Sequence, residues 1–192
     1  MSEIKRVVTL TASVLSGLFL LAMLLGLAVV LTTAMVLQYS FGEIPCPLCL
    51  LQRFAIFGCC FGLIKQLHSD SESGTGISLI FSILLLVISA RQTLLDIVPR
   101  PGHEYVGGAI FGIHMPVWSI FIALALLIGL AVRLTLFGGL RSAAAVESHL
   151  IRRSAQGLAI YVVFICSVNF LSVIVQCGID QCHRSEYRLF VG

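Results

Sequence analysis

The amino-acid sequence predicts an all-α, polytopic membrane protein, a bundle of about five transmembrane helices that forms a single integral membrane domain over residues 1–192. Of these residues, 58% are hydrophobic and only 11% are charged, whereas soluble domains carry roughly a quarter charged residues. Five apolar runs recur along the chain, and each has the ~18 or more residues that a helix needs to cross a bilayer. The lipid bilayer is therefore an expected partner. The net charge of +3 is too small to indicate a nucleic-acid partner.

The five runs are separated by polar segments of different character. The first run follows Lys5 and Arg6, and it is much longer than the ~7–15 apolar residues of a signal peptide, so we expect an uncleaved helix. A polar, Ser/Gly-rich loop at 65–76 precedes the third run, a mixed segment at 99–115 precedes the fourth, and a basic, alanine-rich connection at 138–156 precedes the fifth. The predicted spans are residues 7–37, 47–64, 77–98, 116–137 and 157–176, followed by an outward-facing polar tail at 177–192.

The distribution of basic residues predicts the orientation of the chain. Lysine and arginine accumulate in cytoplasmic loops, and both lysines fall on the same side as the N-terminus, together with the densest arginine cluster. We therefore expect a multi-pass protein of the bacterial inner membrane with a cytoplasmic N-terminus and a periplasmic C-terminus. Five spans then place the Cys46/Cys49 pair, the 99–115 segment and the tail on the outer side, where disulfides persist.

A Cys-x-x-Cys pair at the start of the second run is the main candidate for chemistry. Cys46 and Cys49 are followed by Arg53, and these spacings place all three residues on one face of a helix. The thiolate is the reactive form of cysteine, and both a helix N-terminus and a nearby cation favour it. Pro45 and Pro47 flank the first cysteine and stiffen the turn. The pattern predicts a reactive dithiol at the membrane surface, with Arg53 as its electrostatic partner one turn deeper.

Four short stretches carry a family resemblance. They are CPLCLLQR at 46–53, SARQ at 89–92, GIHMPVW at 112–118 and, in the tail, CGIDQC at 177–182. Together they resemble the disulfide bond formation protein B family, and the tail looks like that of five-span relatives. Members of this family are inner-membrane thiol oxidases that pass electrons from a soluble dithiol oxidase to a quinone.

One feature departs from the pattern of that family. Better-known four-span members carry a second cysteine pair in the loop between spans three and four, and residues 99–115 contain no cysteine here. Cys177 and Cys182 form the remaining pair on the expected outer side. The resemblance therefore implies that this tail pair relays electrons to Cys46 and Cys49. The alternative is that this pair forms a structural staple, a disulfide that only fixes the conformation of the tail.

The cysteines and Arg53 also have non-catalytic interpretations. Cys46 and Cys49 suit a structural disulfide or half of a zinc site, but a zinc site needs about four ligands, so no metal is expected. Arg53 suits a topology signal or a snorkelling side chain, although an arginine inside a span normally has a partner, here a thiolate, a quinone carbonyl or a lipid phosphate. Three cysteines inside apolar runs are expected to act as small hydrophobic residues: Cys59, Cys60 and Cys166.

Two further residues are candidates for cofactor binding alongside Arg53. Arg91 lies near the outer end of the third span, where pairing with Asp96 or with a lipid headgroup is the alternative. His114 borders the fourth span close to Trp118, which is placed as an interface anchor, and a structural role for the histidine is its alternative. The apolar segment 106–115 is too short to span the bilayer. We therefore expect it to lie along the membrane surface and to cover the dithiol.

These residues and the resemblance predict a quinone-dependent, protein-disulfide-forming oxidoreductase. The expected partner is a periplasmic thioredoxin-like dithiol oxidase, whose electrons reach Cys46 and Cys49 by thiol–disulfide exchange and then pass to ubiquinone or menaquinone. Cys46 is assigned as the exchanging sulfur, and Cys49, which lies deeper, as the thiolate that contacts the quinone. Two alternatives remain: a reductase of the same fold that runs electrons outward, and a non-enzymatic membrane scaffold with structural disulfides.

Overall fold

The computed structural model describes residues 2–40, 47–69, 72–98, 109–110, 112–138 and 149–177. Within these ranges, five helices are long and apolar enough to cross a membrane, which confirms the prediction of an all-α membrane bundle. The helices are α1 (Ser2–Ser40), α2 (Pro47–Ser69), α3 (Ser73–Ile97), α4 (Met115–Phe137) and α6 (His149–Cys177).

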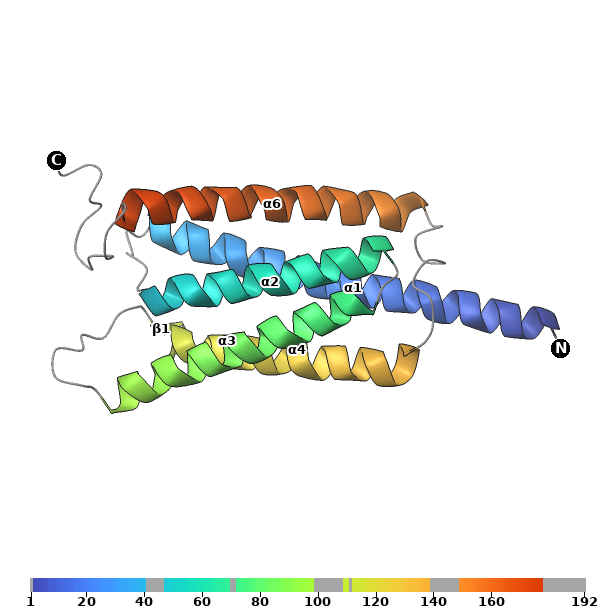
Figure 1. The fold of residues 1–192 in the computed structure, drawn as a ribbon, viewed down its shortest axis with the longest axis horizontal. Coiled ribbons are helices and arrows are strands. Elements are labelled where there is room, and N and C mark those ends of the chain that lie inside the picture. The colour runs from blue at the N-terminus through green and yellow to red at the C-terminus, as the bar shows by residue number, and fades with distance from the viewer. Residues whose placement is uncertain are drawn as a thin grey trace.

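Successive helices alternate in direction along the long axis of the bundle (Figure 1). The start of α2, the end of α3, the start of α4 and the end of α6 therefore share one end of the molecule, which we call the Cys49 end. Helix α2 is central, because it contacts α1, α3 and α6, while α4 packs mainly on α3. The 39 residues of α1 reach about 58 Å at ~1.5 Å per residue, and its N-terminal part projects beyond the other helices (Figure 1).

Small residues bring α2 and α3 into close contact. A Cβ atom on Gly74 would lie 2.6 Å from the carbonyl oxygen of Gly62 and 2.6 Å from the backbone nitrogen of Gln66, so this crossing has no room for a side chain. The Ser78 hydroxyl donates across the same interface to the carbonyl oxygen of Cys59 at 3.1 Å. Close backbone approach and interhelical hydrogen bonds are the usual means of helix association in lipid, where apolar burial drives little.

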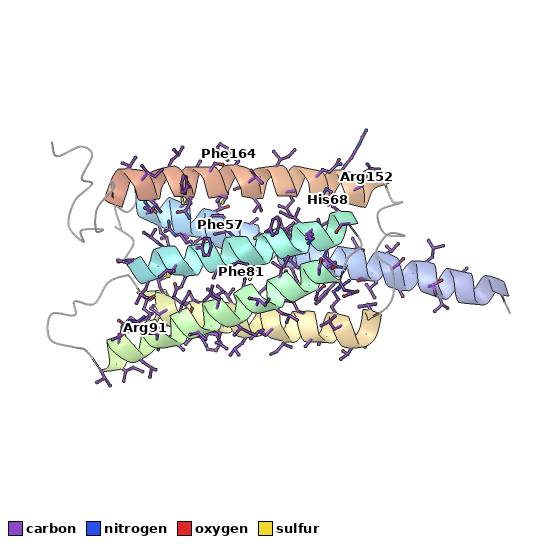
Figure 2. The ribbon with its side chains drawn as sticks, viewed as in Figure 1. Phe57, His68, Phe81, Arg91, Arg152 and Phe164 are labelled. Atoms are coloured by element: carbon purple, nitrogen blue, oxygen red, sulfur yellow. The ribbon has the colours of Figure 1, made fainter. Side chains whose placement is uncertain are left out.

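The outer surface of the bundle is apolar. Leu25 on α1, Phe164 on α6 and Ile128 on α4 are each more than half exposed, and Figure 2 shows Phe164 pointing away from the other helices. Large apolar patches of this kind are rare on soluble monomers. They match the surface that a multi-pass membrane protein presents to lipid.

Two predicted connections were wrong in part, because polar residues there belong to helices. The segment 65–76 is not one loop, since α2 continues to Ser69 and α3 begins at Ser73. Polar groups in this segment form hydrogen bonds between the two helices. Gln66 Oε1 accepts from the backbone nitrogen of Thr75 at 3.3 Å and from the Thr75 hydroxyl at 3.2 Å. Likewise, α6 begins at His149 rather than at residue 157, because exposed polar residues extend this helix beyond its apolar run.

The segment before α4 contains a minimal β-hairpin. Strands β1 (Ala109–Ile110) and β2 (Ile113–His114) pair antiparallel, with Ala109 opposite His114 and Ile110 opposite Ile113. Gly112 in the connection has a φ of 75°, a left-handed conformation that glycine adopts without steric cost. The hairpin lies at the Cys49 end (Figure 1). The predicted placement of 106–115 along the membrane surface stays a prediction, and part of that segment lies outside the described residues.

Candidate functional site

Cys49 lies in the first turn of α2, where it is partly buried and disulfide-bonded. The other cysteines with described side chains are free thiols: Cys59, Cys60 and Cys166. The partner sulfur of Cys49 is therefore not among them, and Cys46 and Cys182 lie outside the described residues. Cys59 and Cys60 are fully buried in the core, as expected for small hydrophobic residues.

A chain of buried and partly buried amides and hydroxyls leads from α4 to the sulfur of Cys49. Gln92 on α3 donates from Nε2 to Cys49 Sγ at 3.5 Å. Gln52 on α2 donates from Nε2 to Gln92 Oε1 at 3.0 Å and to Ser89 Oγ at 3.2 Å. Ser119 on α4 donates to Gln52 Oε1 at 3.3 Å. Three helices therefore meet in one polar network, which we call the glutamine network, beside the disulfide.

The glutamine network was missed as a site by the sequence analysis. Gln52 and Gln92 are 8% and 4% exposed, and an unsatisfied amide in an apolar interior costs several kcal/mol, so each amide needs the partners that it has here. The available signal was the position of glutamines inside apolar runs, where polar side chains are expensive and usually functional. Within the SARQ stretch, the sequence predicts Arg91 rather than Gln92 as a site residue.

Arg53 is buried between three helices. Its side chain is 9% exposed. Nη1 donates to Gln38 Oε1 on α1 at 2.6 Å and to Asn169 Oδ1 on α6 at 3.2 Å, and Nη2 donates to the carbonyl oxygen of Ala34 at 3.1 Å. Met35 Sδ lies 3.6 Å from Nη1. The guanidinium thus joins α2 to α1 and α6 through neutral oxygen and sulfur atoms.

The two halves of the predicted site use different sides of α2. Arg53 follows Cys49 by one turn, but these partners of Arg53 lie on α1 and α6, whereas Gln92, which donates to Cys49, lies on α3. A disulfide sulfur carries no charge, so the oxidised protein has no thiolate for the guanidinium to stabilise. The predicted pairing of Arg53 with a Cys49 thiolate therefore stays a prediction for the reduced protein.

The other predicted cofactor ligands lie at the surface of the Cys49 end. Arg91 is exposed on α3 (Figure 2), while Ser89 and Gln92 of the same helix enter the glutamine network. His114 is exposed at the end of β2 and occupies the N-cap position of α4. Within the described residues, no group of three or more His, Cys, Asp or Glu side chains is placed to hold a metal ion.

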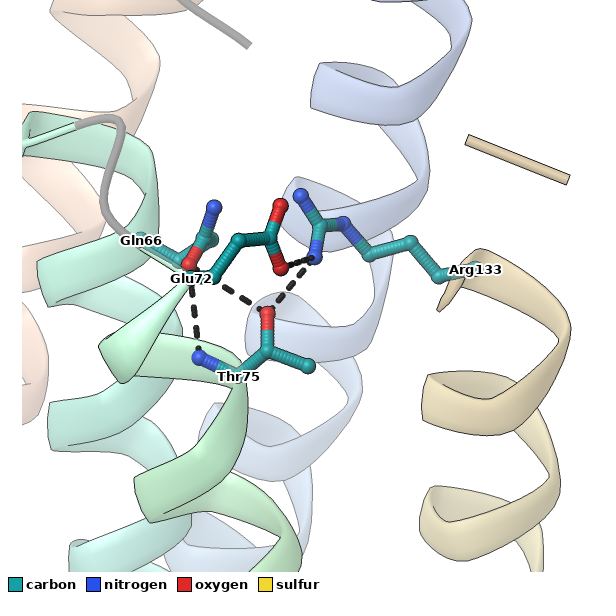
Figure 3. A network of polar contacts seen from close by, with 4 residues as sticks. All are labelled: Gln66, Glu72, Thr75 and Arg133. Atoms are coloured by element: carbon teal, nitrogen blue, oxygen red, sulfur yellow. Dashed lines mark hydrogen bonds and ion pairs between the residues drawn. The ribbon is translucent and has the colours of Figure 1, made fainter. Parts of the chain in front are cut away.

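A second polar cluster lies at the opposite end of the bundle (Figure 3). Arg133 on α4 is 1% exposed, and its Nη1 donates to Thr75 Oγ1 at 2.6 Å and lies 3.6 Å from a carboxylate oxygen of Glu72. Thr75 in turn is bonded to Gln66. This cluster ties α4 to the turn between α2 and α3, which is a structural role.

Comparison with known proteins relates the chain to a single family. The profile of the family described as Disulfide bond formation protein DsbB matches residues 16–104, which include Cys49, Arg53 and the Gln52–Gln92 pair. The chain is 30% identical over 150 residues to Disulfide bond formation protein B of Burkholderia thailandensis, a match that covers 60% of this chain and 82% of that protein.

Two further relatives carry the same description. Disulfide bond formation protein B of Chromohalobacter salexigens is 30% identical over 119 residues, 55% of this chain and 63% of that protein. The protein from Chromobacterium violaceum is 28% identical over 99 residues, 45% of this chain and 57% of that protein. The chain thus spans less than two thirds of the length of these two relatives. No solved structure matches the chain significantly.

Proposed function

Because this chain belongs to the disulfide bond formation protein B family, we propose that it is a membrane oxidoreductase that reoxidises a soluble, thioredoxin-like dithiol protein and passes the electrons to a quinone. The observation that best supports this function is the disulfide of Cys49, which lies in the first turn of a membrane helix beside the glutamine network. A disulfide at a helix mouth is accessible to an incoming thiolate and close to the hydrocarbon region. A purely structural staple would not need a buried amide directed at one of its sulfurs.

In the proposed exchange at Cys49, a thiolate of the dithiol that delivers the electrons, either a reduced tail pair or a small dithiol, attacks the disulfide. The new S–S bond forms as the old one breaks, and the electron pair of the broken bond leaves on a sulfur of the membrane protein as a thiolate. We assign Cys46 as the sulfur that is attacked and Cys49 as the leaving thiolate, because Cys49 lies further into α2. Resolution of the mixed disulfide by the second thiolate of that dithiol leaves both cysteines reduced.

The side chains near Cys49 fit a quinone. Arg53 carries five N–H donors and a permanent charge. Its Nη1 and Nη2 atoms donate to Gln38, Asn169 and the carbonyl oxygen of Ala34, and we propose that the same guanidinium also donates to the carbonyl oxygens of a quinone and the anionic oxygens of its reduced form. When bound, the quinone supplies the two-electron acceptor that protein side chains lack. Arg91 and His114 are proposed as outer contacts of the same group, because Arg91 lies towards the end of α3 (Figure 2) and His114 directly precedes α4, both at the Cys49 end.

We place the Cys49 end on the periplasmic side of the bacterial inner membrane. Lys65, Arg133 and Arg152 lie towards the other end of the bundle, where α2 and α4 end and α6 begins (Figure 1). Positive charge is retained on the cytoplasmic side, so this distribution supports the proposed orientation. The soluble dithiol partner then meets Cys49 in the compartment where disulfides form.

Purified protein mixed with a short-chain ubiquinone or menaquinone and a small dithiol tests this function. We expect the quinone absorbance to fall, with one disulfide of the small dithiol formed per quinone reduced. If reduced quinone instead drives reduction of the disulfide, the protein is a reductase that passes electrons outward. The absence of electron transfer in either direction would indicate a structural role for the disulfide.

We further propose that Cys177 and Cys182 form the entry disulfide attacked by the protein partner. Helix α6 ends at Cys177 and reaches the Cys49 end (Figure 1), which supports the relay, while Cys182 lies outside the described residues. A Cys177→Ser/Cys182→Ser double variant is expected to lose oxidation of the protein partner, because electrons cannot enter by exchange. Reduction of quinone by a small dithiol should persist. Wild-type oxidation of the protein partner in membranes would show that the tail pair is only a staple.

A further inference from the structure

We propose that Gln92 is a catalytic hydrogen-bond donor to Cys49, held in position by Gln52, and that this neutral amide raises the reduction potential of the Cys49 disulfide. The inference deepens the proposed thiol-oxidase function and rests on it. A donor directed at a cysteine sulfur favours the thiolate over the disulfide, because a hydrogen bond to a charged acceptor is stronger than one to a neutral acceptor. The amide therefore makes the disulfide a better oxidant.

The hydrogen bonds around Gln52 orient the amino group of Gln92 towards the sulfur. Gln52 Oε1 accepts from the Ser119 hydroxyl at 3.3 Å, a hydroxyl whose proton is shared with the Met115 carbonyl at 3.4 Å. The Gln52 amino group donates to Gln92 Oε1 at 3.0 Å and to Ser89 at 3.2 Å. The carbonyl of Gln92 is thus used as an acceptor, and its amino group is directed to Cys49 Sγ at 3.5 Å. Each bond sets the direction of the next, so reversal of one amide would place two like groups together.

The donor is also held in place by its surroundings. Gln92 is 4% exposed and Ser89, which accepts from Gln52, is fully buried. Hydrogen bonds in such an interior are stronger than in water, and they reinforce one another along a chain. The amide therefore cannot turn away from the sulfur without breaking its hydrogen bond with Gln52 on α2, which is itself held by Ser89 on α3 and Ser119 on α4.

The chemistry at Cys49 balances without an added reactant. The attacking thiolate of the dithiol brings one negative charge and forms one S–S bond, and the broken S–S bond leaves its electron pair and that charge on Cys49. Gln92 keeps its proton throughout, since it donates a hydrogen bond and does not act as an acid. Its effect is to lower the free energy of the thiolate product relative to the disulfide.

The test is the redox equilibrium of Cys49 in full-length protein, incubated in buffers of oxidised and reduced dithiothreitol. The reduced fraction of Cys49 itself is measured by differential alkylation and peptide mass spectrometry. For Gln92→Met, which keeps side-chain length and removes the donor, we expect the equilibrium constant for reduction to fall about tenfold. For a two-electron couple this equals a shift of about 30 mV to more negative potential.

Gln66→Met is the matched control. Gln66 is another buried glutamine between α2 and α3, but it lies at the opposite end of the bundle, so its loss should leave the potential of Cys49 unchanged. Equal potentials in Gln92→Met and wild type would overturn the inference. An equal shift in Gln66→Met would also overturn it, because the effect would then be a general loosening of the helix pair.

Ser119→Ala provides a second, milder variant if Gln92→Met does not fold. It removes only the hydroxyl that orients Gln52, and we expect a shift of the same sign and about twofold in the equilibrium constant, whereas no shift would overturn the inference. The titration requires neither quinone nor a protein partner. If the Gln92→Met shift is found but wild-type protein fails to reduce quinone, the proposed function is wrong and the role of Gln92 stands.

Discussion

Replacement of Cys49 by serine is expected to reduce dithiol-dependent quinone reduction to the rate measured without protein. A serine hydroxyl forms no disulfide and is not ionised near neutral pH, so the exchange has neither an electrophilic sulfur nor a leaving thiolate. Cys46→Ala should have the same effect, because the assigned disulfide needs both sulfurs. The measurement is the loss of quinone absorbance in detergent or nanodiscs, with the amount of folded protein matched between variants.

Alanine variants of the three free cysteines are the controls for this experiment. Cys59 donates from Sγ to the Ser78 carbonyl at 3.6 Å inside the α2–α3 interface, so its loss should cost some stability but little activity. Cys60→Ala and Cys166→Ala should likewise keep near wild-type turnover, because both residues are free thiols within membrane helices. Normal activity in Cys49→Ser, or loss of activity in all of these variants alike, would contradict the assignment of the redox centre.

The membrane helices could be predicted from the sequence because the bilayer imposes a length and an apolar composition on each one. The predicted starts at residues 47 and 116 are within one residue of the observed ones. The predicted helix ends are wrong where a helix extends beyond its apolar run. Residues 65–69 and 149–156 are polar but helical, because a helix that leaves the apolar layer satisfies its backbone just as well in water.

The lateral arrangement of the helices could not be predicted in this way. Hydropathy does not reveal which face of a uniformly apolar helix meets which neighbour, so it gave no reason to expect Gln52 to contact α3 and α4 while Arg53 contacts α1 and α6. These two residues are adjacent in the sequence and point about 100° apart on a helix. The partners of Arg53 and Cys49 became clear only from three-dimensional packing.

Polar residues inside apolar runs, or directly after them, were the unused signal. Gln38, Gln52, Gln92 and Asn169 are all buried, and each contributes to the surroundings of Cys49 or Arg53. Charge alone predicts Arg91 as a cofactor ligand, but the side chain of Arg91 is exposed. In lipid, however, a neutral amide also needs a partner, so uncharged polar residues in a span deserve equal weight as site candidates.

Arg53→Met is expected to lower kcat/KM for quinone by about 10- to 100-fold, the range that follows from the loss of a hydrogen bond to a charged group. Methionine retains the apolar part of the side chain but removes every N–H donor. Arg53→Lys should recover only part of the loss, since a single ammonium lacks the planar, two-pronged geometry of guanidinium. The measurement is the dependence of the reduction rate on quinone concentration, with a small dithiol held in excess.

Arg133→Met separates a cofactor role of Arg53 from the general cost of removing a buried arginine. Arg133 is more deeply buried than Arg53, and it bonds to Thr75 and Glu72 at the opposite end of the bundle. Its loss should lower the thermal unfolding temperature while leaving the KM for quinone unchanged. Arg53→Met should change both quantities, because Arg53 joins α1 and α6 to α2 and is also proposed to donate to the quinone. An equal rise of KM in the two variants, or an unchanged KM in Arg53→Met, would assign Arg53 to helix packing alone.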